Sequence, residues 1–267
     1  MITLIIDFHA HIFPDALAPR ALKKLTERLT YDITPSTNMT KVSLIESMDK
    51  AGIDISVVQP VVTKPSQLIH TNEFSKEICD DRIISFGGIH PDTDDFKKDI
   101  DFVKKLGLKG LKFHAEYQNF ILDEDRMLRI YDYAFSKDLI VLHHAGLDAG
   151  MPPPYKSNPE MFLNAIRKLK GGVMIAAHFG GHKQWDDVYK YLAGEDIYLD
   201  TSMGFDYFDD ETFIRIMKKH GSDKILFASD SPWSNAKNEI ERIKNLDINN
   251  EDKENIFYKN AKKILKI

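Results

Sequence analysis

Short apolar segments rich in β-branched and aliphatic residues alternate along this chain with longer amphipathic segments. The short segments predict eight strands, near residues 2–9, 54–61, 83–89, 108–114, 139–144, 173–178, 196–201 and 225–230. The amphipathic segments predict helices, near residues 41–51, 70–80, 94–106, 125–137, 158–170, 184–193, 209–220, 236–246 and 252–265. In the first of these helices Val42, Leu44, Ile45 and Met48 share one side, and Gly52 supplies a C-terminal stop.

Strands that alternate with helices predict a parallel sheet with crossover helices. The length of 267 residues matches a (β/α)8 TIM barrel, which typically has about 250. We therefore expect an α/β fold: a parallel eight-stranded barrel with a C-terminal helix, as a single domain over residues 1–267. The competing arrangement is an open doubly wound sheet, but no Gly-x-Gly-x-x-Gly follows the first strand, so dinucleotide binding has no support.

Two connections stand out by their proline content. Residues 12–40 form a long first connection with three prolines, and Met-Pro-Pro-Pro at 151–154 follows the fifth strand. Because the sites of barrel enzymes are built from the loops after the strands, we expect both connections to form rims of a binding cleft.

Composition restricts the partners. Apolar residues make up 43% and charged residues 29%, as in ordinary soluble domains, and the net charge of -5 offers no general attraction to nucleic acid or anionic membranes. No segment approaches the ~20 apolar residues of a membrane span, and the start lacks the pattern of a signal peptide. The single cysteine, Cys79, fits a reducing compartment. We expect a cytoplasmic protein with a small-molecule substrate and no nucleic-acid or membrane partner; a homo-oligomer stays open.

Histidines and one aspartate recur where predicted strands end. His9 and His11 end the first strand, and side chains alternate along a strand, so both project to one side. His144, His178 and Asp230 follow the fifth, sixth and eighth strands. In a parallel barrel all these ends meet at one face, and three imidazoles with a carboxylate suit a divalent ion such as zinc.

The combined pattern of His9-x-His11, His144-Ala-Gly, His178-x-Gly-Gly and Ser-Asp230-x-Pro resembles the amidohydrolase superfamily. It is most similar to the amidohydrolase-2 branch of hydrolases, lactonases and nonoxidative decarboxylases, over nearly the whole chain. The resemblance implies a barrel with one or two divalent metals at its C-terminal face. It implies His9, His11, His144 and Asp230 as metal ligands, and His178 as a residue free to act on water or substrate.

The fourth strand leaves two interpretations of Lys112 open. By the resemblance, Lys112 is a candidate for the carboxylated lysine that bridges two ions. The other interpretation is a buried lysine paired with a carboxylate, for which Asp7 is the candidate because alternation gives it the parity of His9. We favour the second and expect one ion, zinc first, with manganese or iron as alternatives. His143, beside His144, should face the helical layer.

Further residues near strand ends are candidates for substrate contact. These are His90, His114, Glu116, Tyr117 and Trp233, with Asp148 as a further candidate for the pocket lining. His90 could instead satisfy loop carbonyls. We expect His70, His182 and His220 on the surface.

The main functional hypothesis is hydrolysis of a small amide, ester or lactone. A bound divalent ion lowers the pKa of water from 15.7 to about 7; Asp230 would take the proton of that water, and His178 would help to stabilise the oxyanion. The alternative is nonoxidative decarboxylation or hydration of a small carboxylic acid, a branch in which an arginine often binds the substrate carboxylate; Arg20 is the candidate. A non-catalytic metal-binding protein is a third hypothesis. A metal-dependent DNase is disfavoured, because the fourth strand lacks that family's Gly-Glu-x-Gly. The sequence does not fix the substrate.

Overall fold

The computed structural model describes residues 2–30 and 32–267. Its strands are β1 (Ile6–Ala10), β2 (Ile55–Val58), β3 (Ile83–Ser85), β4 (Gly110–Phe113), β5 (Ile140–His143), β6 (Met174–Ala176), β7 (Tyr198–Asp200) and β8 (Ile225–Leu226). Its α-helices are α1 (Ala18–Thr26), α2 (Lys41–Ala51), α3 (Leu68–Glu77), α4 (Phe96–Lys105), α5 (Ala115–Gln118), α6 (Asp125–Ser136), α7 (Pro159–Lys168), α8 (Trp185–Asp187), α9 (Asp210–His220), α10 (Ala236–Asn245), α11 (Asn250–Glu254) and α12 (Asn260–Leu265). Short 3-10 and π segments are η1 (Pro65–Gln67), η2 (His178–Gly180), η3 (Val188–Leu192), η4 (Ser222–Lys224) and η5 (Asn255–Lys259).

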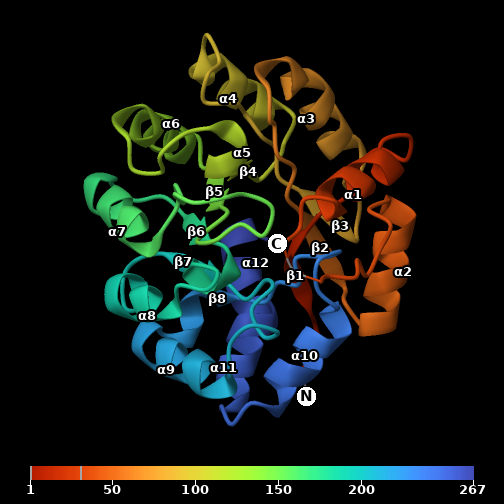
Figure 1. Cartoon of the computed structure of the whole chain (residues 1–267), viewed down its shortest axis with the longest axis vertical. Helices are drawn as coiled ribbons and strands as arrows, with labels where there is room; N and C mark the ends of the chain where they lie inside the picture. Colours follow the sequence, from red (N-terminus) through yellow and green to blue (C-terminus); the bar gives the residue numbers. More distant parts are fainter. Residues whose placement is uncertain (1, 31) are drawn as a thin grey trace.

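The strands pair in parallel and in chain order, β1 to β3 in one group and β4 to β8 in the other. Backbone hydrogen bonds join the two groups at both seams. Lys112 N donates to the carbonyl of Gly87 across 3.0 Å, after the end of β3. Phe8 N donates to the carbonyl of Phe227 across 2.8 Å, and Asp230 N donates to the carbonyl of His9 across 2.8 Å. These bonds continue the parallel pairing around the ring, and the predicted TIM barrel is confirmed (Figure 1).

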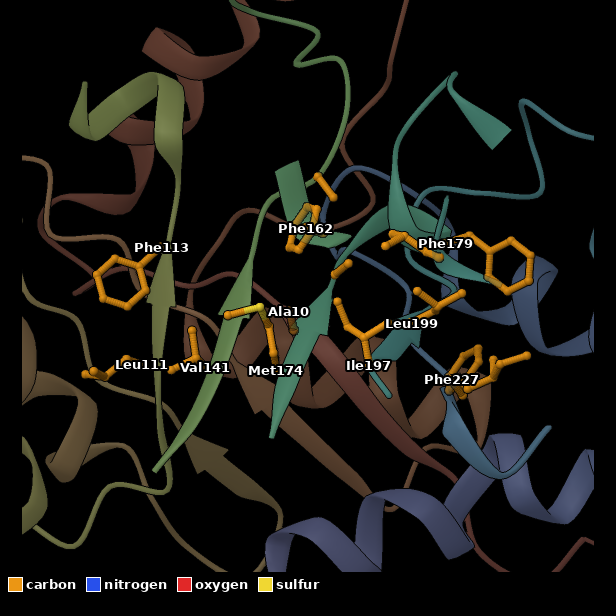
Figure 2. Packing of buried hydrophobic residues seen from close by; sticks show 14 of the residues in the cluster. Ala10, Leu111, Phe113, Val141, Phe162, Met174, Phe179, Ile197, Leu199 and Phe227 are labelled. Atoms are coloured by element: carbon orange, nitrogen blue, oxygen red, sulfur yellow. The ribbon is translucent and has the colours of Figure 1, made fainter. Parts of the chain in front are cut away.

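Helices form an outer ring around the strands (Figure 1). The larger buried cluster lies between strands and helices: Figure 2 shows Phe113 on β4, Leu199 on β7 and Phe162 on α7 within it. A smaller cluster combines residues near the strand starts, such as Ile6 and Leu226, with apolar residues of α12. The C-terminal helix therefore packs against the N-terminal ends of the strands, and leaves the opposite end, where the strands finish, for the site.

Local sequence explains where several helices begin and end. Thr40 caps α2 by accepting a hydrogen bond from Ser43 N, and Gly52 ends it in the left-handed conformation (φ 76°). Asn158, Asp209 and Asn235 cap α7, α9 and α10 in the same way. None of the helices in residues 2–30 and 32–267 has the length and apolar character needed to cross a bilayer.

The first connection differs from the sequence expectation. Residues 12–40 were expected as a long connection, with no helix predicted in it, but they contain α1, which starts with Pro19 in its first turn, where a proline loses no helical hydrogen bond. The apolar residues of this helix lie mainly on one side, which is what allows it to cover another surface.

A register shift in β1, between Asp7 and Ala10, breaks the expected alternation. The Asp7 carboxylate accepts hydrogen bonds from Ser229 N at 2.9 Å and from Ser229 Oγ at 2.6 Å. The expected pairing of Asp7 with Lys112 is therefore wrong, because a bulge interrupts the period of two on which that parity argument rested.

The structure agrees with the expected environment of His143 and differs from that of His220. His143 faces this layer as expected: it is fully buried, stacks on Phe113 and meets Tyr131 of α6 edge to face. His220 was expected on the surface, but only 7% of it is exposed, and its Nδ1 accepts from Gly194 N. His220 lies in an amphipathic segment, and the sequence pattern wrongly assigned its side chain to the exposed face.

The buried Glu239 of α10 generates a stability prediction. Burial, reinforced by nearby Asp206, raises the pKa of Glu239 to about 8, and its Oε2 has no hydrogen-bond partner among the described residues. Between pH 4.5 and 8 the carboxyl is then ionised in the unfolded chain and neutral in the folded one, so stability falls as the pH rises through this window.

We expect Glu239→Gln to remove this loss. Urea titration should give the variant a free energy of unfolding about 2–4 kcal/mol above that of the parent at pH 9. At pH 5 the two free energies should differ little. Glu241→Gln, an exposed position on the same helix, is the matched control and should change stability little at either pH. A parent protein whose stability is flat from pH 5 to 9 contradicts the prediction.

Candidate metal centre and cavity

A cavity of about 550 Å³ opens at the end of the barrel where the strands finish. Its floor carries residues at or after the ends of several different strands: His9 in β1, His11 directly after it, His144 after β5, His178 in η2 and Asp230 after β8. Residues separated by more than 200 positions in the sequence thus meet at one face, as the barrel topology requires.

His9, His11 and Asp230 form the tightest group on this floor. Asp230 Oδ1 lies 3.1 Å from His11 Nε2 and 3.4 Å from His9 Nε2. The three residues form a group whose ligand atoms all lie within 4.8 Å of one another. His9 and Asp230 are almost completely buried, and the His11 side chain is 20% exposed, so the group faces the cavity from below.

The tautomers of both histidines follow from what their other ring nitrogens contact. His9 Nδ1 lies 2.9 Å from Asp200 Oδ2, and His11 Nδ1 lies 2.9 Å from the carbonyl of Gln59. Both partners only accept hydrogen bonds, so each Nδ1 carries a proton and each Nε2 presents a lone pair. Two imidazole lone pairs and a carboxylate that converge in this way fit a divalent cation, with Asp200 and Gln59 as the supports that orient the ligands.

Asp200 and Gln59 were not singled out from the sequence. A signal existed for Asp200, since it ends the seventh predicted strand at the same level as the other strand-end residues. Gln59 acts through its backbone carbonyl, and the pattern of side chains in the sequence does not predict such a contact.

Burial and the neighbouring groups set the protonation states of this group. Burial by itself raises the pKa of Asp230, but nearby His9 together with His11 and His178 outweighs it and holds the pKa well below the usual range. Burial and the neighbouring Lys112 lower the pKa of His9 to about 4. Asp230 is therefore ionised and His9 neutral at physiological pH, the protonation states that metal ligation needs.

Lys112 lies in this group and away from Asp7. Its Nζ is 2.9 Å from His9 Nε2, and the residue is 1% exposed. Burial lowers the pKa of Lys112 to about 8, although Asp200 and Asp230 act in the opposite direction. The lysine thus contacts the same nitrogen that faces Asp230.

His178 and His144 form the next layer of the floor. His178 Nε2 is 2.9 Å from His144 Nδ1, and His178 N donates to Asp200 Oδ1 at 3.0 Å. Among the described residues His144 Nε2, buried, has no hydrogen-bond partner. His144 is not part of the group that His9, His11 and Asp230 form, and its Nδ1 contacts His178 beside that group.

A second group of donors surrounds His114. Its ring stacks between those of Tyr117 and His144, with centroid separations of 3.9 and 4.2 Å. Its Nε2 lies 2.9 Å from Asp148 Oδ2, and its Nδ1 lies 3.5 Å from Glu116 Oε2. His114, His144 and Asp148 also have ligand atoms within 4.8 Å of one another, but parallel stacked rings aim their in-plane lone pairs poorly at one shared ion.

The other candidate residues divide between the cavity and its surroundings. His114, Tyr117, Asp148 and Trp233 line the cavity, whereas His90 and Glu116 do not. His90 Nδ1 accepts from Asp92 N, and Glu116 Oε1 accepts from Lys156 N, so both serve nearby loops.

Three further expectations concern single residues. His182 was expected on the surface, but it is 2% exposed and lines the cavity, because the Gly-Gly turn before it folds back over the floor. His70 is exposed as expected and stands at the cavity wall. Arg20 is exposed on α1 and does not line the cavity, so the structure does not bring it to the site.

The two residues expected to act on substrate both have a strained backbone. Asp230 (φ 61°) and His178 (φ 56°) occupy the left-handed region, which costs on the order of 1 kcal/mol or more for a residue other than glycine. Such conformations persist only where the surrounding contacts fix them, and both side chains line the cavity.

A parallel barrel that gathers imidazoles and carboxylates at its strand ends defines the class of metal-dependent TIM-barrel proteins. Within that class the chain belongs to the amidohydrolase family, whose model matches residues 6–267. A comparison with curated protein sequences found no match.

Solved structures share the fold at low sequence identity. An uncharacterised TIM-barrel protein from Bordetella bronchiseptica is 18% identical, with a TM-score of 0.79 and 99% of both chains covered. A dihydroxybenzoic acid decarboxylase from a Polaromonas species, with bound manganese, is 16% identical, with a TM-score of 0.73, 99% of this chain and 97% of that one. A 5-carboxyvanillate decarboxylase from Sphingomonas paucimobilis is 15% identical, with a TM-score of 0.72 and 99% of both chains.

The geometry predicts which residues control metal affinity. We expect Asp200→Asn to weaken binding of zinc or manganese tenfold to a hundredfold, because Asp200 fixes the tautomer of His9. Asp148→Asn, in the second donor group, is the matched control and should change affinity little. Titration against a chelating dye measures both, and equal losses in the two variants contradict the assignment to the His9, His11 and Asp230 group.

The same group predicts the metal count. Metal analysis of the parent should give one ion per chain, and Lys112→Met should keep that ion, because His9, His11 and Asp230 already supply two imidazoles and a carboxylate that converge without the lysine. Two ions in the parent, of which one is lost in Lys112→Met, would establish the bridging interpretation of this lysine instead.

Proposed function

We propose that this protein is a metal-dependent enzyme that decarboxylates a small carboxylic acid without oxidation. The observation that carries the proposal is the convergence of His9, His11 and Asp230 on the floor of a cavity large enough for a small molecule. The named decarboxylases of the same fold support the choice of reaction, one of them with bound manganese.

The reaction replaces the carbon–carboxylate bond by a carbon–hydrogen bond and releases carbon dioxide, so the substrate carbon takes up one proton. His9, His11 and Asp230 would hold a divalent ion that acts as a Lewis acid for the substrate's oxygen atoms. Asp200 and the Gln59 carbonyl keep both imidazoles in the ligating tautomer. His178, fixed through its backbone by Asp200, is placed at the floor to carry the proton.

Hydrolysis of a small amide, ester or lactone is the second candidate. Its support is the position of Asp230, a carboxylate that lines the cavity beside His9 and His11, where it would take a proton from water. A further observation in its favour is that no arginine stands among the described residues of the cavity lining, so a substrate carboxylate would have to be bound at the floor itself.

We propose manganese or zinc as the ion. Two imidazoles and a carboxylate suit zinc, and manganese accepts the same donors, so the donor set does not separate the two. Reconstitution of the metal-free protein with each ion and comparison of turnover identifies the active form.

Product analysis separates the two reactions. The metal-loaded protein is incubated in deuterium oxide with a panel of aromatic and enol-type acids. It should release one carbon dioxide for each substrate consumed, and one deuterium should replace the carboxylate on the product. For hydrolysis, a panel of lactones and esters in ¹⁸O-water should instead yield one labelled oxygen per product. Turnover only in the second panel would reject the proposed reaction and leave hydrolysis.

Asp230→Asn tests the role of the floor in either reaction. We expect turnover to fall by about 10² to 10⁴, since both the ligand charge and the acid–base group are lost. Asp148→Asn is the control for a carboxylate in the same cavity outside the metal group. Near-parent turnover of Asp230→Asn, with the metal still bound, would show that Asp230 has neither role.

A further inference from the structure

Above the polar floor, one wall of the cavity is apolar, and it is contributed by the first connection of the barrel. Leu17, Leu25 and Leu29, in and beside α1, all line the cavity. Leu17 is 53% exposed, so this part of the wall lies open to solvent. Other apolar lining residues continue this wall around the cavity: Phe13, Met39, Val61, Phe74, Leu147 and Trp233.

The cavity lining has few charged residues. In the part of the chain that the structure describes, Lys112 is the single lysine of the lining, and it contacts His9. The lining carboxylates are Asp230 in the metal group and Asp148, which is paired with His114. Arg28, between Leu25 and Leu29, is exposed and outside the lining, although its charge acts on Tyr117.

The apolar wall is fixed in place across the cavity mouth. Thr30, just after α1, donates to the carbonyl of Ala149 through both its N and its Oγ1, each at 2.8 Å. Ala149 belongs to the connection after β5, which also lines the cavity. These hydrogen bonds therefore join the segment with α1 to the connection after β5, and both line the cavity.

From this distribution we infer that the substrate has an apolar body, a ring or an alkyl chain, joined to one oxygen-bearing head, and that Leu25 and Leu29 select for that body. The inference rests on the proposed function, because the head is what the metal group binds. A second ionic group on the body would lose its hydration against Leu25 and Leu29, and Lys112, the lysine of the described lining, already contacts His9. The volume of about 550 Å³ lies within the range of pockets that hold small organic ligands.

Binding of simple carboxylates to the metal-loaded protein tests this inference by calorimetry. From acetate to butyrate to hexanoate, affinity should rise about fourfold for each methylene that enters the apolar wall. Adipate, which differs from hexanoate by a second carboxylate at the far end, should bind at least tenfold more weakly. Affinity independent of chain length, or equal binding of adipate and hexanoate, overturns the inference.

Variants of α1 locate the effect. Leu25→Asn and Leu29→Asn should weaken hexanoate binding at least fivefold and leave acetate binding unchanged. Leu22→Asn is the matched control: it lies on the same helix but lines a separate surface hollow with Pro19 and Pro35. Circular dichroism and the melting temperature verify folding, and equal effects of all three variants on hexanoate overturn the assignment to Leu25 and Leu29.

A neutral probe keeps the test independent of the metal. N-phenyl-1-naphthylamine, which becomes fluorescent in apolar surroundings, should bind once per chain with or without the ion, and Leu25→Asn should weaken it. Probe binding without any metal-dependent carboxylate binding would support the apolar pocket and reject the proposed metal-bound head. Absence of saturable probe binding overturns the inference itself, whatever the protein's activity.

Discussion

The direction in which the Nε2 atoms of His9 and His11 point is the constraint on which the candidate site depends. An imidazole can present a lone pair at a chosen point only if its other nitrogen is held by an acceptor, and Asp200 and the Gln59 carbonyl supply these acceptors. Asp200 ends β7, and Gln59 follows β2, so neither support exists until the barrel has brought those elements beside β1. The chemistry of the floor is thus a product of barrel closure and does not reside in any short segment.

Much of this arrangement could be predicted from the sequence, because it follows from two regularities. Alternating strands and helices over 267 residues predict the barrel, and parallel strands place their carboxyl ends at one face. That reasoning correctly brought His9, His11 and Asp230 together. It failed where a local irregularity broke the regular period: the register shift in β1 separates Asp7 from the side of His9, so Lys112 contacts His9 instead.

Burial was harder to predict than position along a strand. His182 and His220 look like surface residues, since their neighbours in the sequence are polar or glycine, yet both are buried. What decides their environment is which other segments pack over them, and this information is spread across the whole chain. The same applies to His144, whose sequence neighbours match the resemblance but whose ring contacts His178 and stays apart from the tight group with Asp230.

The ends of the strands supply the polar residues of the floor, and the first connection supplies Leu25 and Leu29 of the wall. The floor residues are compatible with more than one reaction, whereas the wall favours substrates with an apolar body. Strand-end residues are held rigidly by the barrel, and a group of imidazoles and carboxylates fits both decarboxylation and hydrolysis. Leu25 and Leu29 belong to the first connection, which hydrogen bonds from Thr30 to Ala149 join to the connection after β5. A ligand body held against these leucines would exclude water from the floor, and charge interactions around Asp230 strengthen when water is excluded. Binding of the apolar part and reaction at the polar part would then be physically coupled in this cavity.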